Sequence, residues 1–224
     1  MADFSQNEVK FWVDIQDHFI FKSLNDLIPK FSIKMDFKEI RSITEIISNI
    51  VDYKSEFTLR HSKGLSEKAL LMSEFYKFDL DTKYQLGIAA DLHDIGKLAI
   101  SNDILDKNGK LEPFEFLEIK SHAYLTRKAL ENICGFEKIT EWAANHHEKL
   151  NGKGYPLGKT DDELDFCSRI LGCLDIYQAL TEERPYRASL SHEKSISIMK
   201  SMSENYEIDS NIVDSIDKVF CLSI

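Results

Sequence analysis

Apolar residues in this chain recur three or four positions apart, a spacing that places them on one face of an α-helix. Only nine glycines and four prolines interrupt the 224 residues, so sharp turns are few. No segment alternates apolar and polar residues for more than a few positions, as a half-buried strand does. The sequence therefore predicts an all-α fold.

Capping residues and periodicity together predict where the helices begin and end. Asp36 and Glu39 have the spacing of a capping box, and Asp81 and Asp209 are predicted caps of later helices. The predicted helices cover residues 36–53, 58–77, 81–96, 113–132, 137–147, 165–181, 191–203 and 209–220. The predicted buried face of the first holds Ile40, Ile43, Ile47, Ile50 and Val51, and that of the second holds Leu65, Ala69 and Met72.

Composition and charge exclude several classes of protein. A hydrophobic fraction of 43% is enough for a core and argues against wholesale disorder. The formal net charge is −10 and no long run of Lys or Arg is present, so DNA, RNA and anionic membranes are not expected partners.

The chain also lacks signals for a membrane or a secretory destination. No apolar run approaches the roughly 18 residues of a membrane helix, and the first residues lack the pattern of a signal peptide. The four cysteines are scattered without a C-x-x-C pair, which favours reduced, buried thiols. We therefore expect a cytoplasmic protein without membrane insertion.

Five histidines and two aspartates stand where a metal centre would need them. They are His61, His93, Asp94, His122, His146, His147 and Asp175. Imidazole nitrogens and carboxylate oxygens together suit divalent Fe, Mn, Zn or Ni. Taken singly, each of these histidines is more simply read as a hydrogen-bonded or surface residue. The ordered set, and not any one member, favours a metal site.

Two of the candidate ligand pairs are adjacent in the sequence. Neighbouring residues on a helix point about 100° apart, so a pair meets one centre best at a helix end or beside two ions. His93 and Asp94 precede Gly96, a predicted helix end, and His146 and His147 precede a glycine-containing stretch. Asp175 lies on an otherwise apolar helix, where an unpartnered carboxylate would be costly.

The order of these motifs resembles that of the HD-GYP phosphodiesterases, a branch of the HD-domain metal-dependent phosphohydrolases. The resemblance rests on LHDIGK at 92–97, HHEKLNGKGYP at 146–156 and ALTEERPYR at 179–187, and it covers about residues 55–220. It implies an HD-domain helical bundle at 55–224. Residues 1–54 are then predicted to form an N-terminal helical extension, which also offers a route to a homodimer.

The resemblance also implies an activity and a site. Metal-dependent hydrolysis of cyclic di-GMP to linear pGpG, with further hydrolysis to GMP left open, would proceed by attack of a metal-bridging hydroxide on the phosphodiester. Two divalent ions are implied, Fe or Mn first and Zn or Ni as alternatives. Asp94 would bridge them, with His61, His93 and Asp175 completing one site and His122, His146 and His147 the other.

Further residues match the family's substrate contacts. The implied substrate-binding residues are Lys97, Gly154, Tyr155, Arg184 and Arg187, and Lys97 would also assist catalysis beside Asp94. The alternatives are a solvent-facing lysine, a plain glycine turn and solvated arginines in a loop.

Two departures from the family pattern keep other functions open. Asn151 stands where the family usually has Asp, which favours a weak enzyme or a cyclic-dinucleotide sensor. Phe57 stands where some members carry a Glu for a third metal, so two ions are expected. A cyclic GMP–AMP hybrid as substrate and a generic HD phosphohydrolase acting on another phosphoester are the remaining alternatives.

Overall fold

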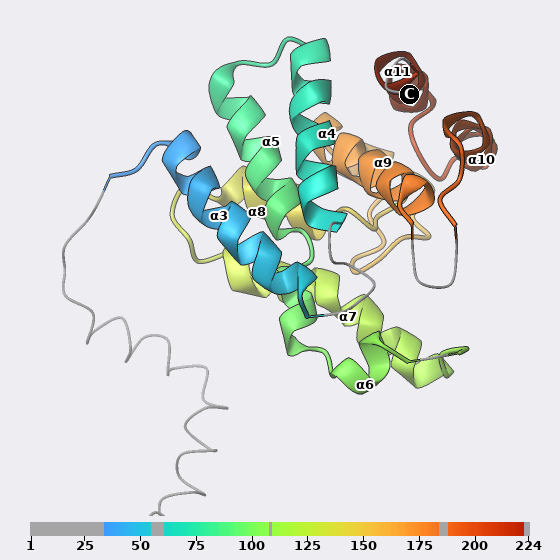
Figure 1. Cartoon of the computed structure of the whole chain (residues 1–224), viewed down its shortest axis with the longest axis horizontal. Coiled ribbons are helices and arrows are strands. Elements are labelled where there is room, and N and C mark those ends of the chain that lie inside the picture. Colours follow the sequence, from blue (N-terminus) through green and yellow to red (C-terminus); the bar gives the residue numbers. More distant parts are fainter. Residues whose placement is uncertain (1–33, 55–60, 108, 184–187, 222–224) are drawn as a thin grey trace, which may run out of the picture. The chain divides into compact units, whose positions relative to one another are not determined.

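The computed structural model describes residues 34–54, 61–107, 109–183 and 188–221. The chain divides into two compact units, Met1–Met35 and Asp36–Ile224, and nearly all of the first lies outside the described residues. The second is built from helices (Figure 1), and its described part contains one isolated β-bridge, between Asn151 and Thr160, and no extended strand. The predicted all-α class is confirmed.

The α-helices follow the predicted order, with short 3-10 helices (η) between some of them. The elements are α3 (Phe37–Asp52), α4 (His61–Phe75), α5 (Leu80–Leu92), η2 (Ile95–Ala99), α6 (Asn102–Leu105), α7 (Pro113–Leu130), α8 (Glu137–Ala144), η3 (Asp161–Glu163), α9 (Phe166–Thr181), α10 (His192–Glu204) and α11 (Ser210–Phe220). The short α6 was not predicted.

The caps agree with the sequence in two helices and differ in one. The capping box of Asp36 with Glu39 is present, and Asp209 caps α11. The cap of the third helix lies two residues earlier than predicted, because Asp79 and not Asp81 accepts a hydrogen bond from the Thr82 amide. The helix also ends at Leu92 and not near Gly96, because the chain turns into η2 there.

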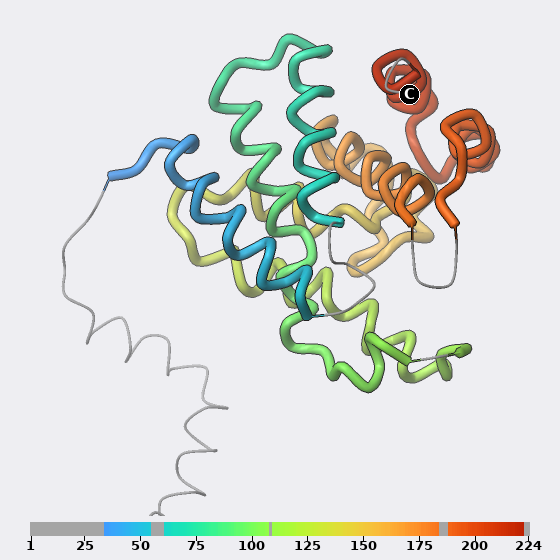
Figure 2. The backbone as a smooth tube through the Cα atoms, viewed as in Figure 1, coloured from blue at the N-terminus to red at the C-terminus, as the bar shows by residue number. Residues whose placement is uncertain are grey.

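Helix α5 lies at the centre of the bundle. It packs against α3, α4, α8 and α9, and the backbone trace shows it beside α3 and α4 (Figure 2). Every residue from Leu86 to Leu92 is buried, as expected of a helix surrounded by others. The residues that follow, His93 and Asp94, are therefore delivered into the interior.

The predicted buried faces are right for α4 and partly wrong for α3. Leu65, Ala69 and Met72 are fully buried in the core. In α3, Ile43 and Ile50 are 46% and 57% exposed, so their predicted burial is wrong. The inward face of α3 is instead Ile40, Thr44, Ile47, Ser48 and Val51, because it packs on α5 through a buried polar contact between Thr44 and Asp91.

Helix α3 belongs to the same compact unit as the helices after residue 60. The predicted division between an extension at 1–54 and a domain at 55–224 remains a prediction. The predicted dimer contact through the extension falls mainly on residues 1–33, which lie outside the described residues.

The cysteines and the length of the helices can be compared with the expectations from composition. All four cysteines are free; Cys167 and Cys173 are buried as expected, but Cys134 and Cys221 are exposed. Burial raises the pKa of both buried thiols to about 12, so they remain protonated. Within the described residues, no helix combines the length and the apolar composition that crossing a bilayer requires.

The backbones of η2 and α7 approach each other at Gly96. A Cβ atom at position 96 would lie 2.0 Å from the carbonyl oxygen of His122. Beside it, the Thr126 hydroxyl donates to the His93 carbonyl at 2.8 Å and accepts from the Gly96 amide at 3.1 Å. This contact fixes the His93–Asp94 turn against the helix that carries His122.

We predict that Gly96→Ala destabilises the ion-free chain by about 1–3 kcal/mol, because a methyl group there meets backbone that cannot yield. Urea unfolding with a chelator present measures this. The control is Gly87→Ala, where the new methyl meets the Arg41 side chain at 3.0 Å, which can move. Equal effects of the two substitutions would contradict the prediction.

We also predict a pH dependence from Asp91. Burial raises its pKa from 3.8 to about 6, against hydrogen bonds from Ser66 and Thr44. The folded chain therefore keeps a proton that the unfolded chain has lost, so this contribution to stability is complete below about pH 4 and is lost as pH rises through about 6. The shift corresponds to roughly 3 kcal/mol.

The measurement compares ion-free wild type with Asp91→Asn by urea unfolding from pH 4 to pH 7. The wild type should lose stability relative to the variant as pH rises, by roughly the amount given above. Parallel profiles for the two proteins would show that Asp91 does not carry the effect.

Candidate metal centre

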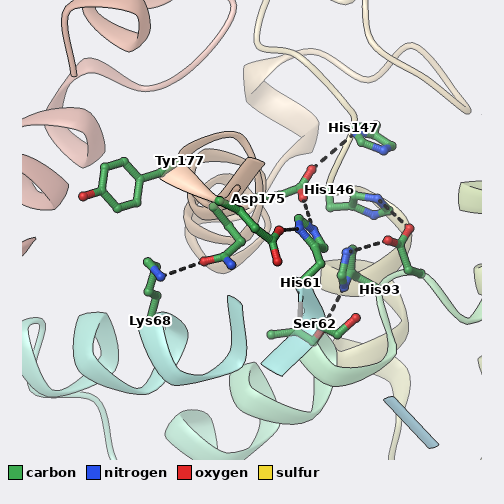
Figure 3. Close-up of polar contacts among 12 residues, drawn as sticks. His61, Ser62, Lys68, His93, His146, His147, Asp175 and Tyr177 are labelled. Atoms are coloured by element: carbon green, nitrogen blue, oxygen red, sulfur yellow. Dashed lines mark hydrogen bonds and ion pairs between the residues drawn. The ribbon is translucent and has the colours of Figure 1, made fainter. Parts of the chain in front are cut away.

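The structure brings together all seven residues that the sequence singled out as metal ligands. His61 is the first residue of α4, His93 and Asp94 form the turn between α5 and η2, His122 lies within α7, His146 and His147 follow the end of α8, and Asp175 lies on α9. Figure 3 shows His61, His93, His146, His147 and Asp175 converging on one region. The helix ends at Leu92 and Ala144 present the two adjacent pairs.

The ligand atoms fall into two groups. His61, His93 and Asp94 form one, and His122, His146 and His147 form the other, with the atoms of each group within 4.8 Å of one another. Asp175 belongs beside both, since its oxygens lie 2.9 Å from His61 Nε2 and 3.7 Å from His147 Nδ1.

Asp94 connects the two groups. Its Oδ2 lies 3.1 Å from His93 Nε2, and its Oδ1 lies 3.3 Å from His122 Nε2 and 4.0 Å from His146 Nε2. A carboxylate whose two oxygens face different clusters is suited to bridging two cations. The role of each residue as a ligand remains a prediction.

Three of the histidines are oriented by their own helices. The Nδ1 atoms of His93, His122 and His146 lie 2.7, 2.5 and 2.6 Å from the carbonyl oxygens of the residues three positions earlier: Ala90, Ile119 and Ala143. A carbonyl accepts only, so Nδ1 carries the proton in each ring. In the neutral ring Nε2 is then left with a lone pair, as a metal ligand requires.

These lone pairs meet inside the protein. His122 Nε2 and His146 Nε2 lie 3.3 Å apart, although neither carries a proton in the neutral tautomer. Among the described residues, the buried atoms His93 Nε2 and Asp94 Oδ1 have no hydrogen-bond partner. Facing acceptors are unfavourable by themselves and become favourable around a cation. The donor set therefore fits bound metal ions.

The protonation states of the histidines and aspartates in the cluster also suit bound metal ions. Burial lowers the pKa of His122, of His146 and of His147, the last to about 4, so these rings are neutral at pH 7. Burial alone would raise the pKa of Asp94 and of Asp175, but neighbouring charges at Asp94, and the hydrogen bond with His61 and neighbouring charges at Asp175, hold both well below their usual value. Both carboxylates are therefore ionised.

His61 differs from the other rings. Burial would lower its pKa, but hydrogen bonds with Asp175 and Glu182 raise it to about 9. In the ion-free chain both of its nitrogens therefore carry protons. A cation in this group would replace the proton on Nε2, which faces Asp175.

Lys97 and Tyr155, two predicted substrate contacts, lie beside the seven residues. The Lys97 ammonium donates to Asp94 Oδ2 at 2.6 Å, and its side chain is 19% exposed. The Tyr155 ring centre lies 4.7 Å from that of His147, and Lys120 Nζ is 5.3 Å from the Tyr155 ring centre. The site thus has cationic groups next to an aromatic surface.

The other predicted substrate contacts differ in what the structure says of them. Gly154 packs on its own loop, where a Cβ would lie 2.4 Å from the Lys149 amide nitrogen, so close packing already requires glycine there. Its contact with substrate remains a prediction. Arg184 and Arg187, like Phe57, lie outside the described residues.

Sequence reasoning missed two carboxylates that hold the site in place. Glu148 accepts hydrogen bonds from the amides of Leu157 and Lys159 at 2.7 and 3.0 Å and so shapes the loop after His147. Glu182 lies 3.0 Å from His61 Nδ1. It follows the last residue of α9, and nothing in the sequence connected it with His61, 121 residues earlier.

His192, which matched no motif, lies in an ordinary buried network. It contacts the Tyr177 hydroxyl at 2.8 Å and Asp217 at 3.0 Å. Both ring nitrogens therefore have partners that lie outside the metal centre.

Comparisons with known proteins agree with this architecture. A family model described as the HD domain matches residues 45–212. The chain is 36% identical to the 3′3′-cGAMP-specific phosphodiesterase 1 of Vibrio cholerae over 207 residues, which is 92% of this chain and 48% of that protein. It is 27% identical to a cyclic di-GMP phosphodiesterase of Pseudomonas aeruginosa over 153 residues, 68% of this chain and 37% of that protein. The chain spans less than half the length of either relative.

A solved structure shares the fold. It is that of Bd1817, a protein from Bdellovibrio bacteriovorus described as HDG"Y"P, with a TM-score of 0.62 and 13% identity. The match covers 83% of this chain and 63% of the other. The HD-type helical bundle expected from the sequence is therefore confirmed.

We predict that divalent ions stabilise this chain through the centre. At an ion concentration 100 times the dissociation constant, one site adds about 2.7 kcal/mol to the free energy of unfolding. Adding Mn²⁺ to the chelator-treated protein should therefore raise its melting temperature. His146→Ala should lose most of this increase, because it removes one of the two facing Nε2 atoms.

His192→Ala is the matched control, since it also removes a buried histidine. Its melting temperature without ions will be lower, but its increase with Mn²⁺ should equal that of the wild type. An unchanged increase in His146→Ala would show that the ions bind elsewhere.

Proposed function

Because this chain belongs to the HD domain family, in its HD-GYP branch, we propose that its centre holds two divalent transition-metal ions and hydrolyses a cyclic dinucleotide. The main support is the convergence of deprotonated Nε2 atoms, His122 and His146 at 3.3 Å, around the buried carboxylate of Asp94. Fe or Mn suits this mixture of nitrogen and oxygen atoms, with Zn or Ni as alternatives.

The electrostatics of the centre suit an anionic substrate. When bound, two divalent ions supply a water of lowered pKa and neutralise charge on a phosphoryl oxygen. With Asp94 and Asp175 ionised, the centre retains about two positive charges, within a chain of net charge −10. A phosphodiester is therefore attracted locally although the whole chain is acidic.

Side chains of this chain are placed to contact the phosphoryl group and a base of the substrate. In the hydrolysis, the water oxygen bonds to phosphorus, the bond from phosphorus to the 3′ oxygen breaks, and that oxygen leaves as an alcohol after gaining a proton. Asp94 holds the Lys97 ammonium at 2.6 Å, which places a cation where it can contact a phosphoryl oxygen. The Tyr155 ring, beside His147, offers a surface for a base.

The names of the relatives support a cyclic dinucleotide as the class of substrate. They differ in which two bases that dinucleotide carries. The match that covers 92% of this chain is named as specific for 3′3′-cGAMP, and a second such protein is 39% identical over 166 residues. Others are named as cyclic di-GMP phosphodiesterases. We propose the hybrid 3′3′-cGAMP as the first substrate to test, with cyclic di-GMP, expected from the sequence, beside it.

The structure weakens the argument for a sensor without turnover, which rested on Asn151. The Asn151 amide donates to the Asn205 carbonyl at 3.2 Å, and its side-chain oxygen accepts from the Lys153 amide at 3.1 Å. A carboxylate would make only the second bond, so asparagine has a structural reason at this position.

We predict that the chain, loaded anaerobically with Mn²⁺ or Fe²⁺, converts a cyclic dinucleotide to its linear form, measured by chromatography of the products. Asp94→Asn should lower the rate by at least about 100-fold, because it removes a charge shared by both groups. Lys97→Ala should lower it by about 10- to 1000-fold.

Lys107→Ala is the matched control for Lys97→Ala, because Lys107 also pairs with a carboxylate, Glu115, at 2.6 Å and lies outside the centre. Its rate should equal that of the wild type. Tight binding of both dinucleotides without product would support the sensor instead, and turnover of other phosphoesters alone would support a generic HD phosphohydrolase.

A further inference from the structure

His61 is held from both sides by carboxylates of one helix. Its Nε2 lies 2.9 Å from Asp175 Oδ1, and its Nδ1 lies 3.0 Å from Glu182 Oε2. Figure 3 shows His61 and Asp175 facing each other at the centre of the cluster. The side chains of His61 and Glu182 are 4% and 14% exposed, so the contact is shielded from water.

His61 differs from three other histidines of the cluster in the partner of its Nδ1. His93, His122 and His146 each orient Nδ1 with the carbonyl three residues earlier in their own helix. For His61 the partner of Nδ1 is a side chain instead. Glu182 takes that place, 121 residues away in the sequence.

The backbone of Glu182 is arranged for this contact. It is the C-cap of α9, with extended φ and ψ angles of −86° and 137°, and its amide donates to the Gln178 carbonyl at 3.0 Å. Asp175 and Glu182 are seven residues apart, which is two helical turns, so they project from the same face. Helix α9 therefore contacts both nitrogens of one ring.

We propose that Glu182 is a positioning residue for the metal centre, which fixes the ring of His61 so that Nδ1 keeps its proton and Nε2 faces the ion. This inference rests on the proposed metal-dependent function and adds to it a residue outside the predicted ligand set. A carboxylate on the far nitrogen both orients a histidine ligand and makes it more basic, and its loss typically costs about 10- to 100-fold in metal affinity.

The test measures Mn²⁺ binding by calorimetry in wild type, Glu182→Ala and Glu182→Gln. We expect Glu182→Ala to weaken one of two bound ions by about 10- to 100-fold and to leave the other near its wild-type affinity. Glu182→Gln keeps an acceptor oxygen but loses the charge, so it should recover part of the loss. Glu183→Gln, the exposed neighbour, should bind both ions as the wild type does.

A second measurement separates positioning from a general effect on folding. In the Zn²⁺-loaded protein with ¹⁵N-labelled histidine, the Nδ1 signal of His61 should show a bound proton in the wild type and shift in Glu182→Gln. Urea unfolding of the ion-free variants measures any structural loss separately. If Glu182→Ala does not fold, Glu182→Gln decides the question.

Wild-type affinity for both ions in Glu182→Gln, with an unchanged Nδ1 signal, would overturn the inference. That result leaves the proposed function standing if the wild type binds two ions and hydrolyses the dinucleotide. A wild type that binds no ions would instead refute the proposed function, so the two failures are distinguishable.

Discussion

The metal centre depends on hydrogen bonds from histidine Nδ1 atoms to nearby backbone carbonyls. Each of His93, His122 and His146 lies at or just beyond a helical turn whose carbonyl oxygen takes that proton. The Nε2 atoms of His122 and His146 then face each other at 3.3 Å, and both rings are buried. The helical fold thus sets the tautomer, the direction and the burial of these rings together.

This arrangement carries an electrostatic cost in the absence of ions. Two buried carboxylates and neutral, mutually facing imidazoles gain little from one another, and Lys97 and protonated His61 supply the available compensation. Groups organised for a ligand at the expense of stability are typical of functional sites. Bound cations would complete interactions that the protein alone leaves unsatisfied.

The sequence could predict the order of helices and most of the cluster, because both depend on local patterns. Periodicity identified the buried face of α4, and the adjacent pairs at helix ends identified four of the residues brought together. The face of α3 was assigned wrongly because Ile43 and Ile50 satisfy the helical period, whereas the packing on α5 selects Thr44 to meet Asp91. Periodicity alone does not distinguish a polar contact that the core requires.

Glu182 could not be found in that way, because its partner His61 lies 121 residues away in the sequence and on another helix. The close approach at Gly96 was likewise visible only as a glycine near a helix end, since the carbonyl that excludes a side chain belongs to α7. Such requirements arise where two helices or turns pack together, so the sequence pattern of neither one reveals them.

Helix α9 and its C-cap make several of these contacts with other elements. At Gly172 a Cβ would lie 3.0 Å from the His146 carbonyl oxygen, and Asp175 and Glu182 follow on the side that faces His61. A slip of α9 by a single residue would rotate it by about 100° and disrupt all three contacts at once. The register of this helix therefore governs three contacts of the metal centre together.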